Sequence, residues 1–289
     1  MEVSKVKNII PSAVWKELRL VRIRRTHSRV AGFCENLIED FYESGPRYGL
    51  KPLKPELAGR KIIWQYWAQG YDHVPDIVGE CLSSVEKYKG DYLLVRLTDD
   101  TLRDYIDIPV QAVHNSREAG LVFYSDLLRF ALLSVYGGVW LDATVMLSAP
   151  LQDRLVDDAF FMFQRDPAAP DKKYWEVTYA YYFGWSNGFR VNVLSSVIYA
   201  RTGSEVINDM CGLLLKFWTE NVTVPDYFFL QILFDVLLHG RLEGRNCRIL
   251  NDCLPHYLQQ YRNDPAFGLA SETEILKMIE VHKLTYKHE

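Results

Sequence analysis

The segment between residues 61 and 97 constrains the fold more than any other part of the chain. Residues 61–67 (KIIWQYW) and 92–97 (YLLVRL) have the apolar, β-branched and aromatic character of buried strands. Between them, Pro75 suits the first turn of a helix that runs to Tyr88 and ends at Gly90. A strand, a helix and a second strand in this space form a βαβ unit, whose two strands are parallel. We therefore predict an α/β fold around a mostly parallel sheet.

The elements that follow are predicted from the same kinds of pattern. Apolar residues recur at helical spacing over 117–136, and Gly137 and Gly138 end that helix. The short run 139–141 (VWL) then forms a buried strand that ends at Asp142. We also expect strands at 159–163 and 174–185, and helices at 204–219, 226–239 and 271–281.

The N-terminal segment differs in charge from the rest of the chain. Residues 1–30 hold eight basic and two acidic residues, and the apolar spacing over 12–43 predicts a helix. Residues 44–60 contain three Gly and three Pro and are typical of a linker to the main domain at 61–289. Two interpretations stay open for residues 1–43: an accessory helical arm with a solvated basic face, or an arm that contacts anionic lipid or a lipid-linked acceptor.

Composition and missing motifs exclude several classes of protein. A net charge of −4 disfavours nucleic acid as the main partner. The five Cys residues include no CxxC pair, so neither a zinc knuckle nor a disulfide framework is predicted. No P-loop, GxSxG or HExxH motif is present. The uncharged run 130–141 is shorter than the about 20 residues that span a bilayer, and no secretory signal is legible, so we expect a cytoplasmic location.

Charged residues interrupt the most apolar part of the chain. Asp126 and Arg129 are three residues apart on one predicted helix, so they project to the same side and reach each other. Asp142 ends a buried strand, at the edge where open α/β sheets bind ligands. A carboxylate there, followed by Thr144, suits a hard divalent cation that neutralises phosphate. The alternatives are a structural ion pair on the helix and a turn-forming aspartate after the strand.

The run 125–144 (SDLLRFALLSVYGGVWLDAT) resembles the core of glycosyltransferases with a DxD-type sugar-binding region. It is similar to the pattern of glycosyltransferase family 32 and the clostridial-toxin glucosyltransferases. Among these it most resembles the capsular polysaccharide synthesis protein family, where D-A-T stands in that place. The resemblance includes KIIWQYWAQG and, more weakly, LSSVIYARTGSEVI and PDYFFLQILF, so it spans roughly residues 60–260.

This resemblance implies a GT-A fold, in which a Rossmann-like sheet binds a nucleotide-sugar donor, with a UDP-sugar favoured. The strand 61–67 would line the nucleobase and ribose. Asp126 would hold the ribose or the sugar, Arg129 would orient the sugar or the pyrophosphate, and Asp142 would face the metal. The donor-binding residues expected on this basis are Trp64, Gln65, Tyr66, Asp126, Arg129, Ser195 and Ser196.

A manganese or magnesium ion is the expected cofactor. Its predicted ligands are Asp142, Thr144 and His256, with Asn251 and Asp252 as further candidates. Thr144 replaces the second aspartate of DxD, and a neutral hydroxyl is a weak ligand, so we expect the metal to be held loosely or not at all. The alternative for His256 is a hydrogen-bonded core or surface histidine.

Three further groups have a functional and a structural interpretation. Asp226 either favours a helix N-terminus or lies near the reacting sugar as a catalytic carboxylate. Ser195 and Ser196, just before the strand-like run VIYA, either face the donor or lie at the edge of the core. The aromatic residues over 174–185 either form an acceptor platform or pack in the core.

The function expected from these observations is hexose transfer from a nucleotide sugar to a hydroxyl of a polysaccharide or glycolipid. Retention of configuration is favoured, because no clear general base for an inverting attack is visible. The expected partners are the donor, a glycan or lipid-linked acceptor and anionic membrane through residues 1–30. The alternatives are a non-catalytic sugar-nucleotide-binding or scaffold subunit and a toxin-like enzyme that glycosylates a host protein.

Overall fold

The computed structural model describes residues 12–45, 49–264 and 270–286. In this part of the chain the strands form a central sheet of five and a small sheet of two. The central order is β2-β1-β3-β6-β5, and β6 runs against its neighbours while the other strands share one direction. These strands are β1 (Ile62–Tyr66), β2 (Leu93–Leu97), β3 (Gly138–Leu141), β5 (Phe160–Gln164) and β6 (Val193–Ala200). The predicted α/β fold with a mostly parallel sheet is confirmed.

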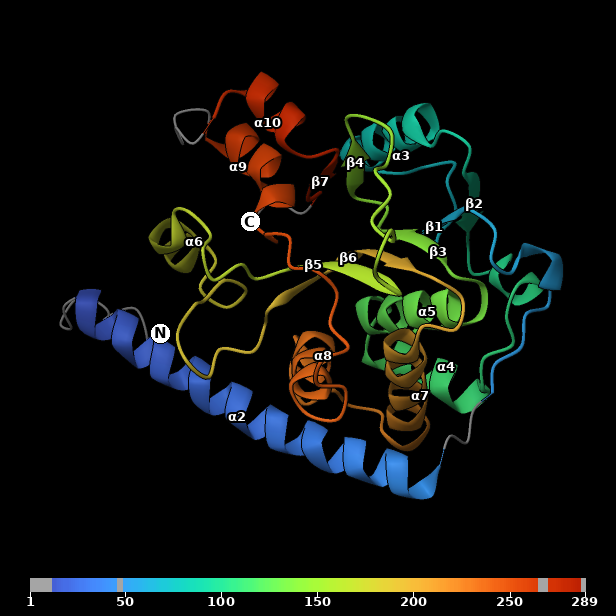
Figure 1. Ribbon diagram of the computed structural model, residues 1–289, viewed down its shortest axis with the longest axis horizontal. Helices are drawn as coiled ribbons and strands as arrows, with labels where there is room; N and C mark the ends of the chain where they lie inside the picture. Colours follow the sequence, from blue (N-terminus) through green and yellow to red (C-terminus); the bar gives the residue numbers. More distant parts are fainter. Residues whose placement is uncertain (1–11, 46–48, 265–269, 287–289) are drawn as a thin grey trace.

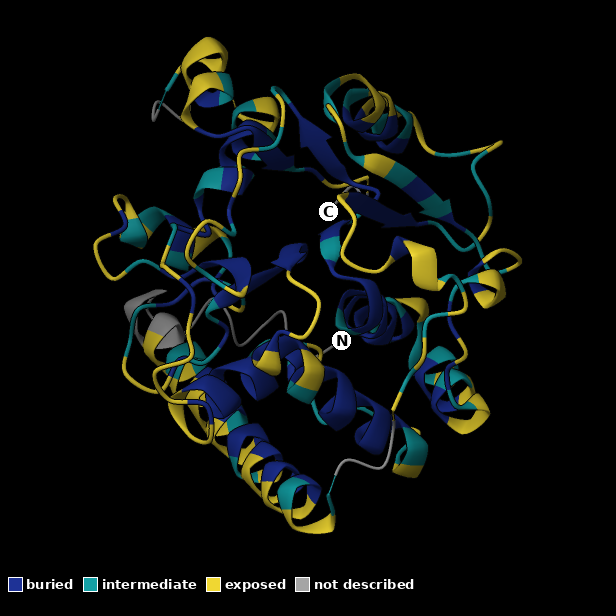
Figure 2. Ribbon diagram, turned by 45° about the vertical axis from the view of Figure 1, so that its right-hand side comes forward, coloured by how far each residue is buried: buried dark blue, intermediate teal, exposed yellow. Residues whose placement is uncertain are grey.

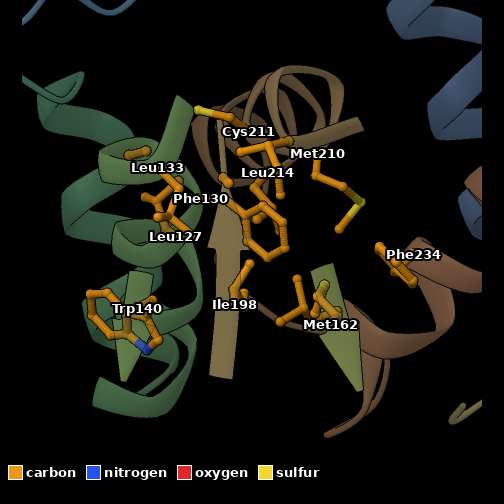
Figure 3. Packing of buried hydrophobic residues seen from close by; sticks show 14 of the residues in the cluster. Leu127, Phe130, Leu133, Trp140, Met162, Ile198, Met210, Cys211, Leu214 and Phe234 are labelled. Atoms are coloured by element: carbon orange, nitrogen blue, oxygen red, sulfur yellow. The ribbon is translucent and has the colours of Figure 1, made fainter. Parts of the chain in front are cut away.

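Helices cover both faces of the central sheet. In Figure 1, α5, α7 and α8 lie below the sheet and α3 lies above it. Every residue of β1, β5 and β6 is buried, which explains why these strands have nearly continuous apolar sequences. Figure 3 shows Phe130 of α5 pointing toward Leu214 of α7 and Ile198 of β6. The helices are α3 (Asp76–Tyr88), α5 (Leu121–Tyr136), α7 (Glu205–Glu220) and α8 (Phe229–His239).

Two glycines shape the chain on either side of α5. The predicted helix over 117–136 is in fact two helices, α4 (Val110–Ala119) and α5, because Gly120 has a φ of 136° between them. At the start of β3, a Cβ on Gly138 would lie 2.6 Å from the carbonyl oxygen of Ile62. Glycine therefore lets β3 pair closely with β1, and this pairing places Asp142 at the end of the sheet.

The helix α2 (Ser12–Ser44) packs against α7 and α8. A Cβ on Gly212 of α7 would lie 2.6 Å from the ring of Phe41, so the two helices approach closely. Figure 2 shows buried and exposed residues alternating along α2, as expected for a helix with one face on the core. Its buried apolar residues are Ile23, Val30, Ala31, Cys34, Leu37, Ile38 and Phe41. The helix is confirmed, and it shares the main core, while the division into arm, linker and main domain stays a prediction.

The predicted strand at 174–185 is wrong. The chain forms α6 (Lys172–Thr178) and then turns. Trp175, Tyr179 and Phe183 recur at four-residue steps, and the ring of Trp175 contacts the other two. A spacing of four places side chains on one side of a helical turn, so these rings pack together without a strand.

A small sheet near α3 was not predicted. It pairs β4 (Val145–Leu147) with β7 (Val281–Lys283) in antiparallel register. The predicted last helix over 271–281 ends at Met278, and the chain then continues into β7. The pairing returns the C-terminal segment to the end of β3. The remaining elements are α9 (Tyr257–Asn263), α10 (Glu272–Met278), η1 (Pro55–Leu57), η2 (Leu102–Asp104) and η3 (Leu254–His256).

None of the helices in the described ranges has both the length and the apolar character needed to cross a bilayer.

Candidate functional site

A cleft of about 1210 Å³ opens where β1 and β3 end and β6 begins. Its walls come from the first half of α5, the turn after β3, the start of β6, the chain around Phe228 and the C-terminal segment. The predicted site residues that line it are Tyr66, Asp126, Arg129, Asp142, Thr144, Ser195, Ser196 and His256. The fold therefore brings most of the predicted residues to one place.

Arg129 contacts several residues of the cleft wall. Its side chain is 5% exposed, and its guanidinium lies 3.2 Å from Asp126 and 3.5 Å from Asp142. Nη1 donates to the carbonyl of Ser195 at 2.6 Å, while Nε and Nη2 donate to the carbonyl and hydroxyl of Ser125, each at 3.2 Å. The predicted pairing of Asp126 with Arg129 is confirmed. Arg129 also ties α5 to β3 and β6.

The two carboxylates beside Arg129 differ in environment. Burial raises the pKa of Asp126 to about 6, although Arg129 opposes this shift. Asp142 is more exposed, at 23% of its side chain, and its Oδ1 accepts a hydrogen bond from Trp140 Nε1 at 2.8 Å. Its backbone N–H donates to the carbonyl of Ser196, which anchors the residue to β6. Asp142 is therefore held firmly but still faces the cleft.

Lys283 completes this group, and sequence reasoning missed it. Its Nζ donates to Thr144 Oγ1 and lies 3.9 Å from Asp142 Oδ2. Burial lowers the pKa of Lys283, and Asp142 opposes that shift. No local signal in the sequence marks this lysine, because it reaches Thr144 only through the pairing of β7 with β4.

His256 lines the cleft but is enclosed by aromatic rings. Its ring lies 5.4 Å from Phe183 and 5.6 Å from Tyr182, measured between centroids. Burial, with lesser contributions from the cations Lys283 and Arg165, lowers the pKa of His256 to about 3. The histidine is therefore neutral in a positively charged neighbourhood.

The residues present fit a divalent cation poorly. The described residues include no group of three or more His, Cys, Asp or Glu side chains placed to hold a metal. Asp142 already lies between Arg129 and Lys283, and the Thr144 hydroxyl accepts a hydrogen bond from the lysine. Asp252 is bound by Arg165 through two contacts of 3.0 Å. A metal ion at this place stays a prediction.

Three predicted residues do not line the cleft. Trp64 is fully buried and donates from Nε1 to the carbonyl of Gly137 at 2.9 Å. Gln65 is also fully buried, and its side chain accepts from Arg96. Asp226 accepts a hydrogen bond from the N–H of Phe228 at 2.8 Å, just before α8 begins.

Several buried polar atoms in the cleft wall have no hydrogen-bond partner among the residues that the structure describes. They are Ser196 Oγ, Gln231 Oε1 and His256 Nε2. Leaving such atoms unpaired costs about 1–3 kcal/mol each, so a bound ligand or water is expected to satisfy them. Gln231, on α8, was not predicted. The wall also holds the aromatic rings of Tyr179 and Tyr182, from the predicted platform.

Comparison with known families finds the family that the sequence around Asp126, Arg129 and Asp142 resembles. Residues 19–289 match the model of the capsular polysaccharide synthesis protein family. The chain belongs to this family. A capsular polysaccharide synthesis protein of this kind has a role in making the capsule, and the match includes most of α2 and all of β7. No curated protein matched the chain.

Proposed function

We propose that this capsular polysaccharide synthesis protein is a GT-A-type glycosyltransferase. It moves a hexose from a nucleotide sugar, with UDP as the favoured nucleotide, to a hydroxyl of a bacterial surface polysaccharide or glycolipid. The observation that supports this most is the group of Arg129, Asp126 and Asp142 at the end of β3, inside a cleft with unpaired polar atoms. Ligands of open α/β sheets bind at this edge.

The chemistry of the cleft suits departure of a diphosphate. In the proposed transfer, the bond between C1 of the sugar and the diphosphate oxygen breaks, and its electron pair stays on the diphosphate. The acceptor oxygen bonds to C1, and its proton passes to the departing diphosphate. Fixed cations at the cleft wall stabilise the negative charge that develops.

The same geometry supports the proposal that the transfer retains configuration. An inverting attack needs a carboxylate free to take the acceptor proton on the far side of the sugar. Asp126 is buried beside Arg129, and Asp142 is hydrogen-bonded by Trp140 and flanked by Arg129 and Lys283. With Asp126 and Asp142 engaged in these contacts, the leaving diphosphate is the proposed base, which keeps the attack on the same face.

A thermal-shift panel of UDP-, GDP-, CMP- and dTDP-sugars, with and without manganese, tests the donor. We expect one class of nucleotide sugar to raise the melting temperature of the protein. We also expect the protein to release the nucleoside diphosphate when it is incubated with that donor. Binding without release would favour a non-catalytic sugar-nucleotide-binding subunit instead. A chain that binds none of the four would contradict the proposed function.

We also propose that the exposed side of α2 contacts anionic lipid at the cytoplasmic face of the membrane. On α2, Leu18, Arg22, Arg25 and Arg29 follow one another at three- and four-residue steps, Val21 lies between Leu18 and Arg25 at the same spacing, and all are exposed. Basic and apolar side chains on one face are typical of helices that lie on membranes. Because the other face of α2 packs on α7 and α8, the helix would hold the enzyme against the surface.

Reversing two of these charges tests the contact with lipid. The variant Arg22→Glu/Arg25→Glu is expected to weaken binding to vesicles containing phosphatidylserine at least about 30-fold, because each basic residue that is lost contributes about 1 kcal/mol and the new carboxylates are repelled by anionic lipid. Vesicle sedimentation at low and high salt measures this, and binding of the wild type should weaken as salt rises. Arg60→Glu/Arg103→Glu, which alters exposed arginines elsewhere, is the matched control. Equal losses in the two variants would refute a specific face.

A further inference from the structure

The position where a metal was expected faces a lysine of the same chain. Lys283 comes from β7, which pairs with β4 so that Lys283 is opposite Val145, just after Thr144. Its Nζ contacts the Thr144 hydroxyl and lies 3.9 Å from Asp142 Oδ2. The lysine therefore contacts two of the three side chains, Asp142 and Thr144, that were predicted to hold the metal.

The surroundings of Lys283 fix the position of its ammonium group. The backbone N–H of Leu284, the residue after Lys283, donates to the carbonyl of Thr144 at 2.9 Å. This hydrogen bond holds the end of β7 next to Thr144. The lysine side chain is 25% exposed and lines the cleft. Nearby, Tyr286 contacts Trp67 across the cleft wall, with ring centroids 5.6 Å apart. The ammonium group is thus held by backbone pairing but keeps access to a ligand.

The charge around Asp142 is already balanced without a metal. Arg129 lies 3.5 Å from one carboxylate oxygen and Lys283 lies 3.9 Å from the other. A divalent cation beside Asp142 would be repelled by both groups and would have to displace the lysine from Thr144. Across the ranges that the structure describes, no cluster of acidic, histidine or cysteine side chains offers the ion a better place.

We propose that Lys283 is a catalytic residue that takes the place of the divalent cation, so that transfer needs no metal. This inference rests on the proposed glycosyltransferase function. As the C1–O bond breaks, the electron pair moves to the diphosphate, and the Lys283 ammonium contacts those oxygens without giving up its proton. Arg129 stays in its hydrogen bonds and holds Asp142, which in turn positions the lysine.

The first test measures nucleoside diphosphate release by the full chain, with the donor identified in the panel, in excess EDTA. We expect the chelated wild type to keep most of its activity. Loss of activity in EDTA and its return with manganese would overturn the role of Lys283 and leave the proposed function intact. An absence of release under every condition would instead contradict the proposed function.

The second test replaces the lysine. Lys283→Met keeps the aliphatic stem and is expected to lower kcat at least about 100-fold in EDTA, the usual effect of removing one group that stabilises developing negative charge. Lys277→Met, at an exposed position on α10, is the matched control and should stay within about twofold of wild type. Retention of more than a third of wild-type kcat by Lys283→Met would overturn the proposal.

A folding control separates catalysis from structure. The melting temperature of Lys283→Met is compared with that of Lys283→Gln, which keeps a hydrogen-bond donor for Thr144 without the charge. We expect both variants to fold and both to lose activity, because the charge is what matters. Near-wild-type activity of Lys283→Gln would show that Lys283 acts only as a hydrogen-bond donor and would overturn the proposal. The chelation test does not depend on either variant.

Discussion

Replacing Asp142 with Asn is expected to lower the rate of sugar transfer about a thousandfold, with a change in melting temperature of no more than about 3 °C. Asn has the same shape, and its oxygen can still accept the hydrogen bond from Trp140 Nε1. It lacks the charge that holds Arg129 and Lys283 at the cleft wall. The substitution is therefore expected to lower the transfer rate and to leave the fold unchanged.

Transfer rate and thermal unfolding of Asp142→Asn are measured together. Asp107→Asn, at an exposed position outside the cleft, is the matched control and should behave as wild type. Activity close to wild type would contradict the assignment of Asp142 to the site. A fall of more than about 10 °C in melting temperature would show that Asp142 mainly stabilises the turn after β3.

The variant Arg129→Lys is expected to lower the transfer rate more than about tenfold and the free energy of unfolding by about 2–4 kcal/mol. Lysine keeps the charge but cannot reproduce a planar group that donates at once to Ser195 and Ser125 while contacting Asp126 and Asp142. The carbonyl of Ser195 would lose its donor inside the protein, and Asp142 would be held less firmly.

Chemical denaturation and the transfer rate check this prediction. Arg190→Lys is a matched control, because Arg190 also binds a carboxylate, Asp235 at 2.8 Å, but does not line the cleft. That variant should keep its activity. If Arg129→Lys supported more than a tenth of the wild-type rate, the forked geometry of Arg129 would not be needed.

The central sheet was predictable because most of its strands are buried on both faces. Strands such as β1 and β5 then have short apolar runs with recognisable ends. Gly137 and Gly138 marked the change from α5 to β3, and the structure shows why the second one is required. The spacing of Asp126 and Arg129 correctly predicted their contact. The local sequence pattern was sufficient to predict features that lie within a single helix or strand.

The rest of the site depends on pairings between distant segments. Lys283 meets Thr144 across 139 positions of sequence, through a three-residue strand whose sequence is ordinary. Gln231 enters the cleft only because α8 packs against β6. Trp64 and Gln65 belong to a predicted strand, but their side chains are buried away from the cleft. A sequence pattern alone does not determine such contacts.

The wrong prediction of a strand at 174–185 has a similar cause. Its aromatic residues are compatible with a period of two, which indicates a strand, and with a period of four, which indicates a helical turn. Packing decides between them, because Trp175 lies 4.9 Å from Phe183 and 5.6 Å from Tyr257 of α9, measured between ring centroids. The partner helix α9 was itself not predicted.

The most direct test of the proposed function compares wild type and Asp142→Asn under identical conditions. It measures how much nucleoside diphosphate each protein releases from a nucleotide sugar. Chromatography of the reaction mixture measures the diphosphate and the free or transferred sugar. We expect steady release by the wild type, with the hexose in equal amount, and about a thousandfold less by the variant. Equal release by the two proteins, or none by the wild type with any of the four donor classes, would contradict it.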